Sequence, residues 1–594
     1  MPRVYFTVVI SGTAWLSLAF LLFFIHHENK QIMGNIKQAM VADIAAVGPP
    51  VIHPHNVHDM RGGGLTRKLD GNDEDLDSVL GQLDKDIPRF GPGEGGQPLI
   101  LSGKALEKAK KSRDLHNFNL VVSDKISLER TVKDTRDPRC QDITYRFSKF
   151  PTASVIIAFH NEAWSTLMRT VHSVVNRTPR DILTEVVLVD DASTDEDLKK
   201  KLLNIPKSVR GKVRLVHTTQ REGVARAKMR GAREARGEVL VFLDAHCEVN
   251  THWLEPMLDL VHQGPTTVVS PIIDKIDPET FGFEDGSLAR VTFRWSLETR
   301  RIPLSQIEKA ERLNPLEPVR SPLTNGGIFA VSKSFFEKIG GIDAGLDGWG
   351  ADGLDFSMKT WMCGGSVYVV PCSRVGHVTR QVPPYSFPGS IQTSYQRNLV
   401  RIAETWMDEY KDEFYSAVPD ARDRYFGDVS EIQSLRARLS CHSFDWYLSH
   451  VTPSLLATAN NARRAWGRVH NQNHDVCFMP SEEGKKLVLD ICSNYNEKQA
   501  LLLTKDFEIR FEDLCLDLSD YRVGQHVTFE ACHGMAGTQE WIHSKPGKIK
   551  HRESGYCLDV AIGRIYKPQL MTNECNDSGT QRWEFRHYTK RMNH

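Results

Sequence analysis

The sequence has no excess of charge of either sign, few cysteines for its length and a single long hydrophobic run. Lys and Arg total 75 and Asp and Glu total 75, so the chain lacks an overall basic footprint for nucleic acid. Its 11 cysteines are too few for a disulfide-dense mini-scaffold. With 40% hydrophobic residues it is neither a bundle of membrane spans nor disordered in bulk. A length of 594 residues favours about two to four domains.

The hydrophobic run covers residues 5–25 and contains no charged residue. As a helix it would extend about 30 Å, the thickness of a bilayer core. A cleaved signal peptide is the alternative, but its apolar region would be only about 7–15 residues long. We therefore predict an uncleaved anchor, with residues 1–4 cytoplasmic and the rest of the chain lumenal, as in a type II protein. Residues 26–115 show no sustained apolar period and are predicted to be a stem.

From Ser154 onward, short apolar segments alternate with segments of helical spacing. The expected strands are 154–159, 185–191, 213–218 and 238–249, and the clearest helices are 162–175 and 224–236. This alternation predicts right-handed βαβ units and a mostly parallel sheet. Ligands of such sheets bind beyond the carboxyl ends of the strands. The polar residues at those ends are Asp190, Asp191, Asp244 and His246.

The last part of the chain contains partial repeats. CLD occurs at 515–517 and 557–559, and Gln-x-Trp recurs at the same interval, at 539–541 and 581–583. Three units of about 40 residues with short strands fit a three-fold β-trefoil over 467–594, after a linker at 452–466. Three similarly spaced cysteine pairs suggest three bridged loops and an oxidising compartment, with reduced buried thiols as the alternative. The pairs are Cys477–Cys492, Cys515–Cys532 and Cys557–Cys575.

Asp244 and His246 stand two residues apart where a predicted strand turns into a loop, so their side chains can converge on one cation. Oxygen and nitrogen ligands together suit Mn²⁺ better than Ca²⁺, and His377 is the candidate third ligand. The alternative for an isolated Asp-x-His motif is a solvent-exposed turn that binds no metal. A metal with few protein ligands is usually completed by substrate phosphates and would neutralise a leaving diphosphate.

Further polar residues are candidates for binding a nucleotide. Asp191 can accept a hydrogen bond from a uracil or ribose group, or it can cap the helix that follows. Arg221, Lys228 and Arg380 are placed to face a diphosphate, with surface solvation as the alternative for each.

Eight segments then follow one another in a distinctive order. They are DTRDPRC (134–140), FHNEAWSTLMRTVHSVVNRTP (159–179), LVDDAS (188–193), REGVARAKMRGA (221–232), FLDAHCEVN (242–250), SPLTNGGIFAV (321–331), WMCGG (361–365) and PCSRVGHV (371–378). In these segments the chain resembles the polypeptide N-acetylgalactosaminyltransferases, the Golgi enzymes that start mucin-type O-glycosylation. The segment VSDKISLER (122–130) and Trp361-Met362 make it look closest to the subgroup that prefers already glycosylated peptides.

The resemblance implies a GT-A-type, Rossmann-like α/β catalytic domain over 116–451 and a ricin B-type β-trefoil lectin domain over 467–594. It implies retaining transfer of GalNAc from UDP-GalNAc to Ser or Thr hydroxyls of polypeptides or glycopeptides, with Mn²⁺ as cofactor. The family offers no well-supported side-chain nucleophile, so a front-face route assisted by the diphosphate is its usual mechanism. The implied metal ligands are Asp244, His246 and His377. The implied nucleotide-binding residues are Asp191, Arg221, Lys228 and Tyr385, and the implied catalytic residues are Trp349, Asp352 and Arg380.

The resemblance also implies two bridges in the catalytic domain, Cys140–Cys372 and Cys363–Cys441, and leaves Cys247 as a buried thiol. The implied lectin sugar sites are Asp517 with His533 and Asp559 with Asn573, whereas the first repeat lacks both partners. Turn stabilisation is the alternative for both aspartates. The sequons at Asn176 and Asn576 are usable for N-glycosylation in a lumenal protein.

One segment departs from the family's usual Trp-Gly-Gly-Glu-Asn-x-Glu, because residues 349–355 read WGADGLD. Asp352 and Asp355 keep the two carboxylates with one methylene less, and a displacement of about 1 Å can cost roughly 100-fold in rate. Asn325 replaces the usual Ala and is expected to add a side chain near the sugar, and Lys228 replaces the usual Arg. Two hypotheses follow: an active enzyme with altered rate or preference, or a weak or inactive homologue that acts as a Golgi GalNAc-binding lectin.

Overall fold

The computed structural model describes most of the chain from residue 90 onward. The described residues are 90–145, 150–304, 306–380, 384, 390–459, 462–471, 473–481, 486–493, 496–545, 547–562 and 568–589. The predicted anchor at 5–25 lies outside these ranges. Among the described residues, no helix is both long and apolar enough to cross a bilayer.

The first domain begins earlier than its predicted boundary. Helix α3 spans Gly103–His116, and the Leu99 amide donates a 2.8 Å hydrogen bond to the Thr280 carbonyl. The prediction that residues up to 115 form a stem is therefore wrong for residues 90–115, which pack against the body that follows. The low hydrophobicity of α3 explains the error: among the described side chains of this helix that precede His116, only that of Ala109 is buried.

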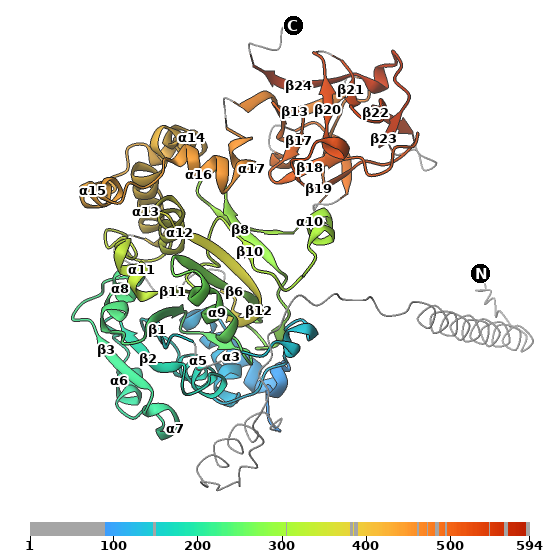
Figure 1. The fold of residues 1–594 in the computed structure, drawn as a ribbon. Helices are drawn as coiled ribbons and strands as arrows, with labels where there is room; N and C mark the ends of the chain where they lie inside the picture. The colour runs from blue at the N-terminus through green and yellow to red at the C-terminus, as the bar shows by residue number, and fades with distance from the viewer. Residues whose placement is uncertain are drawn as a thin grey trace, which may run out of the picture. The chain divides into compact units, whose positions relative to one another are not determined.

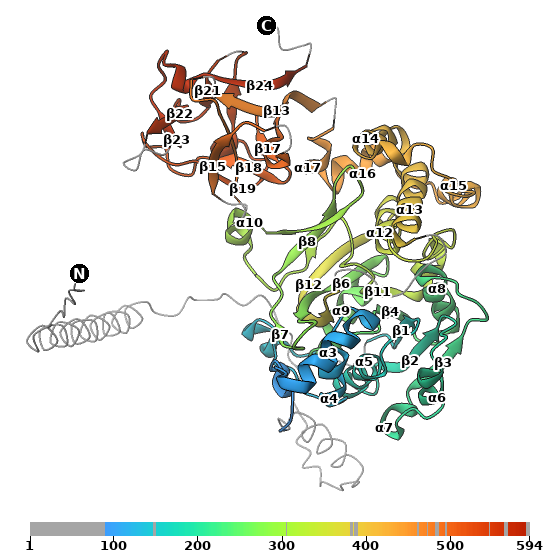
Figure 2. The same cartoon turned by 180° about the vertical axis from the view of Figure 1, so that it is seen from behind.

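The first domain is built on a large mixed sheet (Figures 1 and 2) in the order β10-β12-β6-β11-β4-β1-β2-β3. Its strands are β1 (Ala153–Phe159), β2 (Leu183–Asp190), β3 (Val213–His217), β4 (Val239–Leu243), β6 (Thr267–Ile276), β10 (Val319–Arg320), β11 (Phe329–Ser332) and β12 (Ser366–Val378), with β5 (Cys247–Val249) and β7 (Phe283–Glu284) attached. The four strands β1 to β4 pair in parallel, as predicted. The second half mixes parallel and antiparallel pairs, which the sequence pattern did not indicate.

The single strand predicted at 238–249 is two strands, β4 and β5, separated by Asp244–His246. Apolar side chains continue on both sides of this turn, so the pattern hid the break. The turn lifts Asp244 and His246 out of the sheet at the carboxyl end of β4, where ligands of α/β proteins bind.

Helices cover both faces of this sheet because successive strand residues point to opposite sides. On one side Val155, Ile157 and Leu188 pack with α5 (Trp164–Arg177) and α9 (Glu255–Gln263). On the other side Ile156 and Val187 pack with α8, α12 and α13. The helices on this second side are α8 (Val224–Glu234), α11 (Lys333–Lys338), α12 (Asp352–Met362) and α13 (Ile391–Trp406).

The first domain also contains a two-stranded hairpin, β8 (Ala289–Phe293) and β9 (Thr299–Pro303). The remaining helices are α4 (Leu120–Lys125), α6 (Glu196–Leu202), α7 (Lys207–Arg210), α10 (Gln306–Glu311), α14 (Lys411–Ala417), α15 (Ser430–Arg438), α16 (Phe444–His450) and α17 (Pro453–Leu456). The predicted linker at 452–466 thus contains α17, and the first strand of the next domain begins inside it at Arg463.

The second domain is all β, as the repeats predicted. Its strands are β13 (Arg463–Asn471), β14 (Val476–Pro480), β15 (Leu487–Ile491), β16 (Leu501–Thr504), β17 (Ile509–Phe511), β18 (Leu514–Asp517), β19 (Thr528–Ala531), β20 (Trp541–His543), β21 (Ile549–His551), β22 (Cys557–Ile562), β23 (Pro568–Asn573) and β24 (Trp583–Tyr588). The repeated tryptophans make equivalent bonds: the Trp541 indole N–H donates to the Leu516 carbonyl and that of Trp583 donates to the Leu558 carbonyl. These bonds and the buried indole rings explain why Gln-x-Trp recurs.

The cysteines pair as the sequence analysis expects. The disulfides are Cys140–Cys372, Cys363–Cys441, Cys477–Cys492, Cys515–Cys532 and Cys557–Cys575. Cys247 is a buried free thiol. Two of these bridges connect distant parts of the first domain, and the other three each close one short loop of the second.

Candidate functional site

A cavity of about 320 Å³ lies where β1 and β4 end, and it gathers most of the predicted site residues. The charged or imidazole side chains that line it are His160, Glu162, Lys228, Asp244, His246, Asp352, His377 and Arg380. A smaller cavity lined by Asp191 and Arg221 shares Phe159, Val224 and Trp349 with it. The two cavities therefore adjoin each other at the carboxyl edge of the sheet, and we refer to them together as the cleft.

Asp244, His246 and His377 come together at one end of the cleft, with one ligand atom of each within 4.8 Å of the others. His377 is brought there by β12, which pairs with β5 so that His377 lies opposite Cys247. The His377 Nε2 is 3.2 Å from the Asp244 carboxylate. One carboxylate and two imidazoles are a donor set that suits Mn²⁺, so the residues present fit this ion.

The protonation states of this cluster suit metal binding. Burial and the nearby Arg380 lower the pKa of His246 to about 4, so its imidazole is neutral at physiological pH. Burial alone would raise the pKa of Asp244, but a hydrogen bond from His377 and the charge of Lys228 hold it well below its usual range. A neutral imidazole and an ionised carboxylate are the forms that bind metals.

Glu162 supports this cluster and was not singled out from the sequence. Its carboxylate lies 3.0 Å from His246 Nδ1, which leaves Nε2 as the ligand atom of that ring. The same carboxylate accepts two 2.7 Å hydrogen bonds from Arg380. Burial opposes its ionisation, but Arg380 and His246 hold the pKa of Glu162 well below its usual range. The signal that could have identified Glu162 in the sequence is its position just beyond the end of β1.

Glu162→Gln is expected to weaken Mn²⁺ binding by about 10- to 100-fold, the usual cost of altering a residue that orients a metal-bound histidine. The amide keeps the size of the side chain but removes the charge that His246 and Arg380 share. Isothermal titration of the purified variant with Mn²⁺ measures the effect. Glu279→Gln, a change at a half-exposed glutamate, is the matched control. Unchanged Mn²⁺ affinity in Glu162→Gln would show that Glu162 does not orient the histidine.

Asp191 is buried at the end of the cleft that the smaller cavity forms, and it organises the loop that precedes α8. Its carboxylate accepts hydrogen bonds from the amides of Glu222 (2.7 Å) and Gly223 (2.9 Å) and from the Thr218 hydroxyl (3.1 Å), and it pairs with Arg221. The alternative role as a cap of α6 is wrong, because Asp195 caps that helix. His160, also missed from the sequence, lines both cavities beside Asp191, and its Nδ1 lies 2.8 Å from the Asp191 carbonyl.

Lys228 and Asp352 form a buried ion pair in the same cavity, with 2.8 Å between Nζ and the carboxylate. Burial lowers the pKa of Lys228, but Asp352 and Asp244 outweigh burial and raise it, so the ammonium remains charged. The surrounding chain is shaped for this pair. A Cβ at position 327 would lie 2.1 Å from Lys228 Nζ, so a larger residue there would displace the ammonium.

Two other departures in this region, Asp355 and Asn325, do not line the cavity. Asp355 is buried on the far side of α12, where it accepts hydrogen bonds from the Trp406 indole (2.9 Å) and the Asp343 amide (3.1 Å). The Asn325 side chain donates a 2.7 Å hydrogen bond to the Pro271 carbonyl and does not line the cavity. The expectation that Asn325 adds a side chain near the sugar is therefore wrong, because the backbone turns its side chain into the core.

Trp349 stands at the mouth of the cleft, with 39% of its surface exposed and its ring centroid 6.2 Å from that of Tyr395. It lines both cavities, so the structure brings it near both the Asp244, His246 and His377 cluster and Asp191. Arg380 lines the larger cavity. Tyr385 lies outside the described residues.

Ala351 precedes α12 in a left-handed conformation, with φ 70°. Because this conformation favours glycine, Ala351→Gly is expected to stabilise the protein by about 1 kcal/mol. Thermal unfolding of the variant measures this as a higher midpoint. Ala109→Gly, which places the same change in the middle of α3, should instead lower the midpoint, because glycine weakens helices. A lower midpoint for Ala351→Gly would show that the left-handed conformation of Ala351 does not strain the backbone.

The lectin residues also come together in pairs. Asp517 accepts 2.9 Å hydrogen bonds from Thr538 and Gln539, and His533 lies 3.2 Å from the same Thr538 hydroxyl. In the third repeat, Asp559 accepts a 3.1 Å hydrogen bond from Asn573. Asp559 Oδ1 is buried and accepts no hydrogen bond from the described residues.

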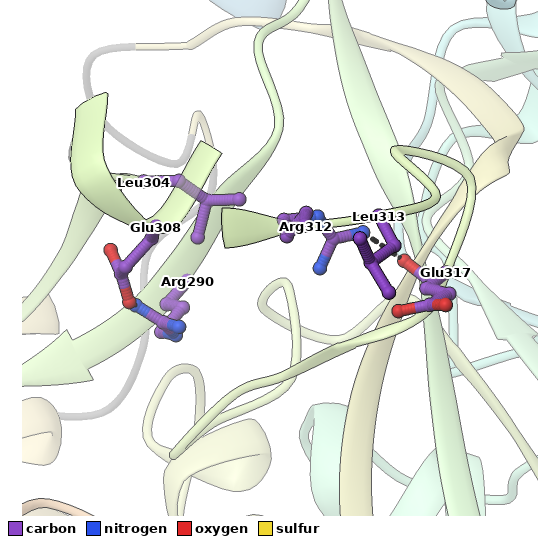
Figure 3. A pocket seen from close by; sticks show the side chains of 6 residues that line it. All are labelled: Arg290, Leu304, Glu308, Arg312, Leu313 and Glu317. Atoms are coloured by element: carbon purple, nitrogen blue, oxygen red, sulfur yellow. Dashed lines mark hydrogen bonds and ion pairs between the residues drawn. The ribbon is translucent and has the colours of Figure 1, made fainter. Parts of the chain in front are cut away.

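The remaining predicted positions lie apart from the cleft. Asn176, near the end of α5, lines a separate cavity of about 250 Å³, and Asn576 is exposed in the third repeat. A further cavity of about 360 Å³ adjoins β8 and α10 (Figure 3). It is lined by Arg290, Leu304, Glu308, Arg312, Leu313 and Glu317, and Arg290 pairs with Glu308 at 2.5 Å. No residue predicted to be functional lines this last cavity.

Comparison with protein families matches both domains. Residues 154–340 match glycosyl transferase family 2, residues 315–382 match the N-terminal domain of galactosyltransferase, and residues 465–583 match the ricin-type beta-trefoil lectin domain. Together with the cleft, these matches define a GT-A glycosyltransferase joined to a ricin-type lectin domain.

Similar proteins narrow this class. Polypeptide N-acetylgalactosaminyltransferase 13 of Rattus norvegicus is 40% identical over 505 residues, which cover 84% of this chain and 90% of its own. Polypeptide N-acetylgalactosaminyltransferase 11 of Xenopus tropicalis is 38% identical and covers 79% of this chain and 81% of its own. The crystal structure of GalNAc-T7 with UDP, GalNAc and Mn²⁺ is 34% identical, covers 85% of this chain and 95% of its own, and has a TM-score of 0.59. The chain belongs to the polypeptide N-acetylgalactosaminyltransferase family.

Proposed function

We propose that this protein transfers GalNAc from UDP-GalNAc to Ser or Thr hydroxyls of polypeptides or glycopeptides, with retention at the anomeric carbon. The observation that carries the proposal is the convergence of Asp244, His246 and His377 in the cavity that also contains the Lys228–Asp352 pair. In this cavity the metal-binding cluster would hold a diphosphate at one end, and the buried ion pair would hold a sugar at the other end. The family membership of the chain supports the same reaction.

Asp244, His246 and His377 would hold Mn²⁺. When bound, the ion supplies positive charge that stabilises a leaving diphosphate. Arg380 adds a second positive group on the same side of the cavity, since its guanidinium is within hydrogen-bond reach of Glu162, the carboxylate that orients His246. Preorganised charges of this kind act where charge develops in the transition state.

The sugar end of the cavity is defined by Lys228 and Asp352. Asp352 is the first residue of α12, where the helix dipole favours a negative charge, and its carboxylate accepts a 2.8 Å hydrogen bond from Lys228, which neutralises that charge. We propose that the second carboxylate oxygen accepts hydrogen bonds from donor-sugar hydroxyls. Trp349 at the mouth of the cleft would cover the sugar and exclude water during transfer.

Transfer by the purified protein with UDP-GalNAc and Mn²⁺ tests this proposal. Acceptors are a panel of unmodified Thr peptides and the same peptides already carrying GalNAc, and mass spectrometry measures each added residue. Transfer to either panel is the expected result, and faster transfer to the glycopeptides would support the predicted acceptor preference. If the folded protein binds UDP with Mn²⁺ but transfers GalNAc to neither panel, the proposal that it is an enzyme is wrong.

The second candidate function is a lectin that holds GalNAc-bearing glycoproteins without turnover. Asp559 supports the sugar-binding part of this candidate, because its buried Oδ1 accepts no hydrogen bond from the described residues while Oδ2 is bonded to Asn573. A sugar hydroxyl would satisfy this oxygen. Loss of binding to immobilised GalNAc in Asp559→Asn, with Asp577→Asn as control at an exposed carboxylate, would support sugar binding in the third repeat.

We further propose that residues 5–25 anchor the protein in the Golgi membrane with both domains in the lumen. The uncharged length of that run supports this proposal, as do the five disulfides, which require an oxidising compartment. Protease digestion of intact Golgi vesicles should leave both domains protected unless detergent is added. Digestion without detergent would place them on the cytoplasmic side.

A further inference from the structure

The short segment 347–350 brings Trp349 to the mouth of the cleft and forms neither helix nor strand. It lies just before α12, and Gly348 and Gly350 adopt positive φ values of 61° and 90°. A Cβ at position 350 would lie 2.7 Å from the Tyr395 ring, so the segment packs closely against α13. Backbone of this kind depends on neighbouring elements for its hydrogen bonds, because its N–H and C=O groups have no helix or strand partners.

The side chain of Asn398 supplies such bonds from α13. Its Oδ1 accepts a 2.8 Å hydrogen bond from the Asp347 amide, and its Nδ2 donates to the carbonyls of Asp347 (2.8 Å) and Gly350 (3.1 Å). Asn398 is fully buried, so these three bonds are shielded from water. Because Trp349 lies between the two bonded residues, one side chain fixes the backbone on both sides of it.

A second element holds the middle of the same segment. The Val224 amide, at the start of α8, donates a 2.9 Å hydrogen bond to the Gly348 carbonyl. A Cβ at Gly223 would lie 2.7 Å from that carbonyl oxygen, and the Gly223 amide is itself bonded to Asp191. The segment is therefore held between α8 and α13, so the place of Trp349 is set before a ligand binds.

We propose that Asn398 is a positioning residue that holds Trp349 over the donor sugar, so that the sugar passes to the acceptor hydroxyl and not to water. This inference rests on the proposed function for the identity of the sugar and the acceptor. Asn398 lines neither cavity of the cleft and acts only through the backbone of 347–350. Its role is thus to maintain the exclusion of water that Trp349 provides.

The competing reaction is hydrolysis of the donor. The bond between the anomeric carbon and the diphosphate breaks, the same carbon bonds to the oxygen of water, and free GalNAc, UDP and a proton are released. The share of free GalNAc among the products therefore reports how well the cleft excludes water.

The first test measures the position of Trp349 in the ligand-free, full-length protein labelled with 5-fluorotryptophan. The chain contains 11 tryptophans, and Trp349→Phe identifies the ¹⁹F signal of Trp349. Asn398→Asp keeps the size of the side chain and its acceptor oxygen but removes both donations to the carbonyls. It is expected to shift or broaden the Trp349 signal and to leave the other signals in place, including that of Trp406 on the same helix.

The second test separates transfer from hydrolysis. Transfer from UDP-GalNAc to a Thr peptide by Asn398→Asp is expected to fall by roughly 10- to 100-fold, the cost of a displacement of about 1 Å, while the share of free GalNAc rises. Trp349→Ala should have the same two effects. The double variant should lose no more than Trp349→Ala alone, because Asn398 acts through Trp349. Asn398→Ala, which removes all three bonds, replaces Asn398→Asp if that variant does not fold.

Thr405→Val is the matched control. Thr405 is also buried on α13, but its hydroxyl donates within the helix, to the Arg401 carbonyl at 2.7 Å. This variant should lower the thermal midpoint without moving the Trp349 signal or raising the share of free GalNAc. An unmoved Trp349 signal in the Asn398 variant, equal effects in Thr405→Val, or losses that multiply in the double variant would reduce Asn398 to a packing role.

The proposed function and this inference fail in different ways. If the unmodified protein transfers no GalNAc, the proposed function is wrong, and the ¹⁹F signal still decides whether Asn398 positions Trp349. If the unmodified protein transfers GalNAc and Asn398→Asp does so at the same rate and with the same share of free GalNAc, the inference alone is wrong.

Discussion

His246→Ala is expected to abolish sugar transfer, with a loss of more than about 100-fold, because altering a residue that merely orients a metal ligand already costs 10- to 100-fold. The change removes one of three ligand groups that lie within 4.8 Å of one another. It also removes the partner of Glu162 Oε2, which leaves this buried carboxylate with Arg380 as its charged neighbour. Mn²⁺ affinity, measured by titration, should fall together with the rate.

Two comparisons make this prediction specific. Chelation of Mn²⁺ from the unmodified protein should produce the same loss, and added Mn²⁺ should restore transfer. His262→Ala changes an exposed histidine on α9 and should leave both rate and affinity unchanged. Transfer by His246→Ala at more than a tenth of the normal rate would mean that the cluster is not the functional metal site.

The second large effect is expected at the Lys228–Asp352 pair. Asp352→Asn and Lys228→Met should each lower kcat/KM by about 100-fold or more, because each removes a charge and leaves its buried partner unpaired. The double variant should lose less than the product of the two single losses, since the pair is already broken by either change. Steady-state kinetics of the four proteins measure this coupling.

Folding must be followed in the same four proteins, because breaking a buried ion pair is strongly destabilising. Thermal midpoints identify any variant that loses activity through unfolding. Asp347→Asn, which alters a half-exposed carboxylate paired with Arg226, is the control. Losses that simply multiply in the double variant would show that Lys228 and Asp352 act independently, and full activity of Asp352→Asn would mean that this carboxylate does not contact the donor.

Much of the first domain was predictable because its strands are continuous apolar segments. The positions of β1, β2 and β3 and the parallel pairing follow from that pattern. The break between β4 and β5 did not, because apolar residues continue on both sides of Asp244–His246. The helix α3 was missed for the opposite reason, since a mostly exposed helix has almost no apolar face to detect.

The candidate site likewise contains residues that the sequence predicted and residues that it did not. Asp244, His246, His377 and Lys228 were predicted, and the structure brings them into one cavity. Glu162 was missed because a single glutamate after a strand has no distinctive spacing, although it contacts both His246 and Arg380. Asn325 was placed wrongly near the sugar because the direction of its side chain depends on the local backbone.

The sequence by itself determined the elements that depend on near neighbours: the apolar strands, the repeats of the lectin domain and the family to which their residues point. Only the tertiary structure decided which distant side chains share an environment. Arg380 meets Glu162 across 218 residues and Lys228 meets Asp352 across 124, and neither separation leaves a periodic trace. The physical reason is that strand and helix patterns arise from local geometry, whereas the charge balance of a buried site depends on how whole elements pack together.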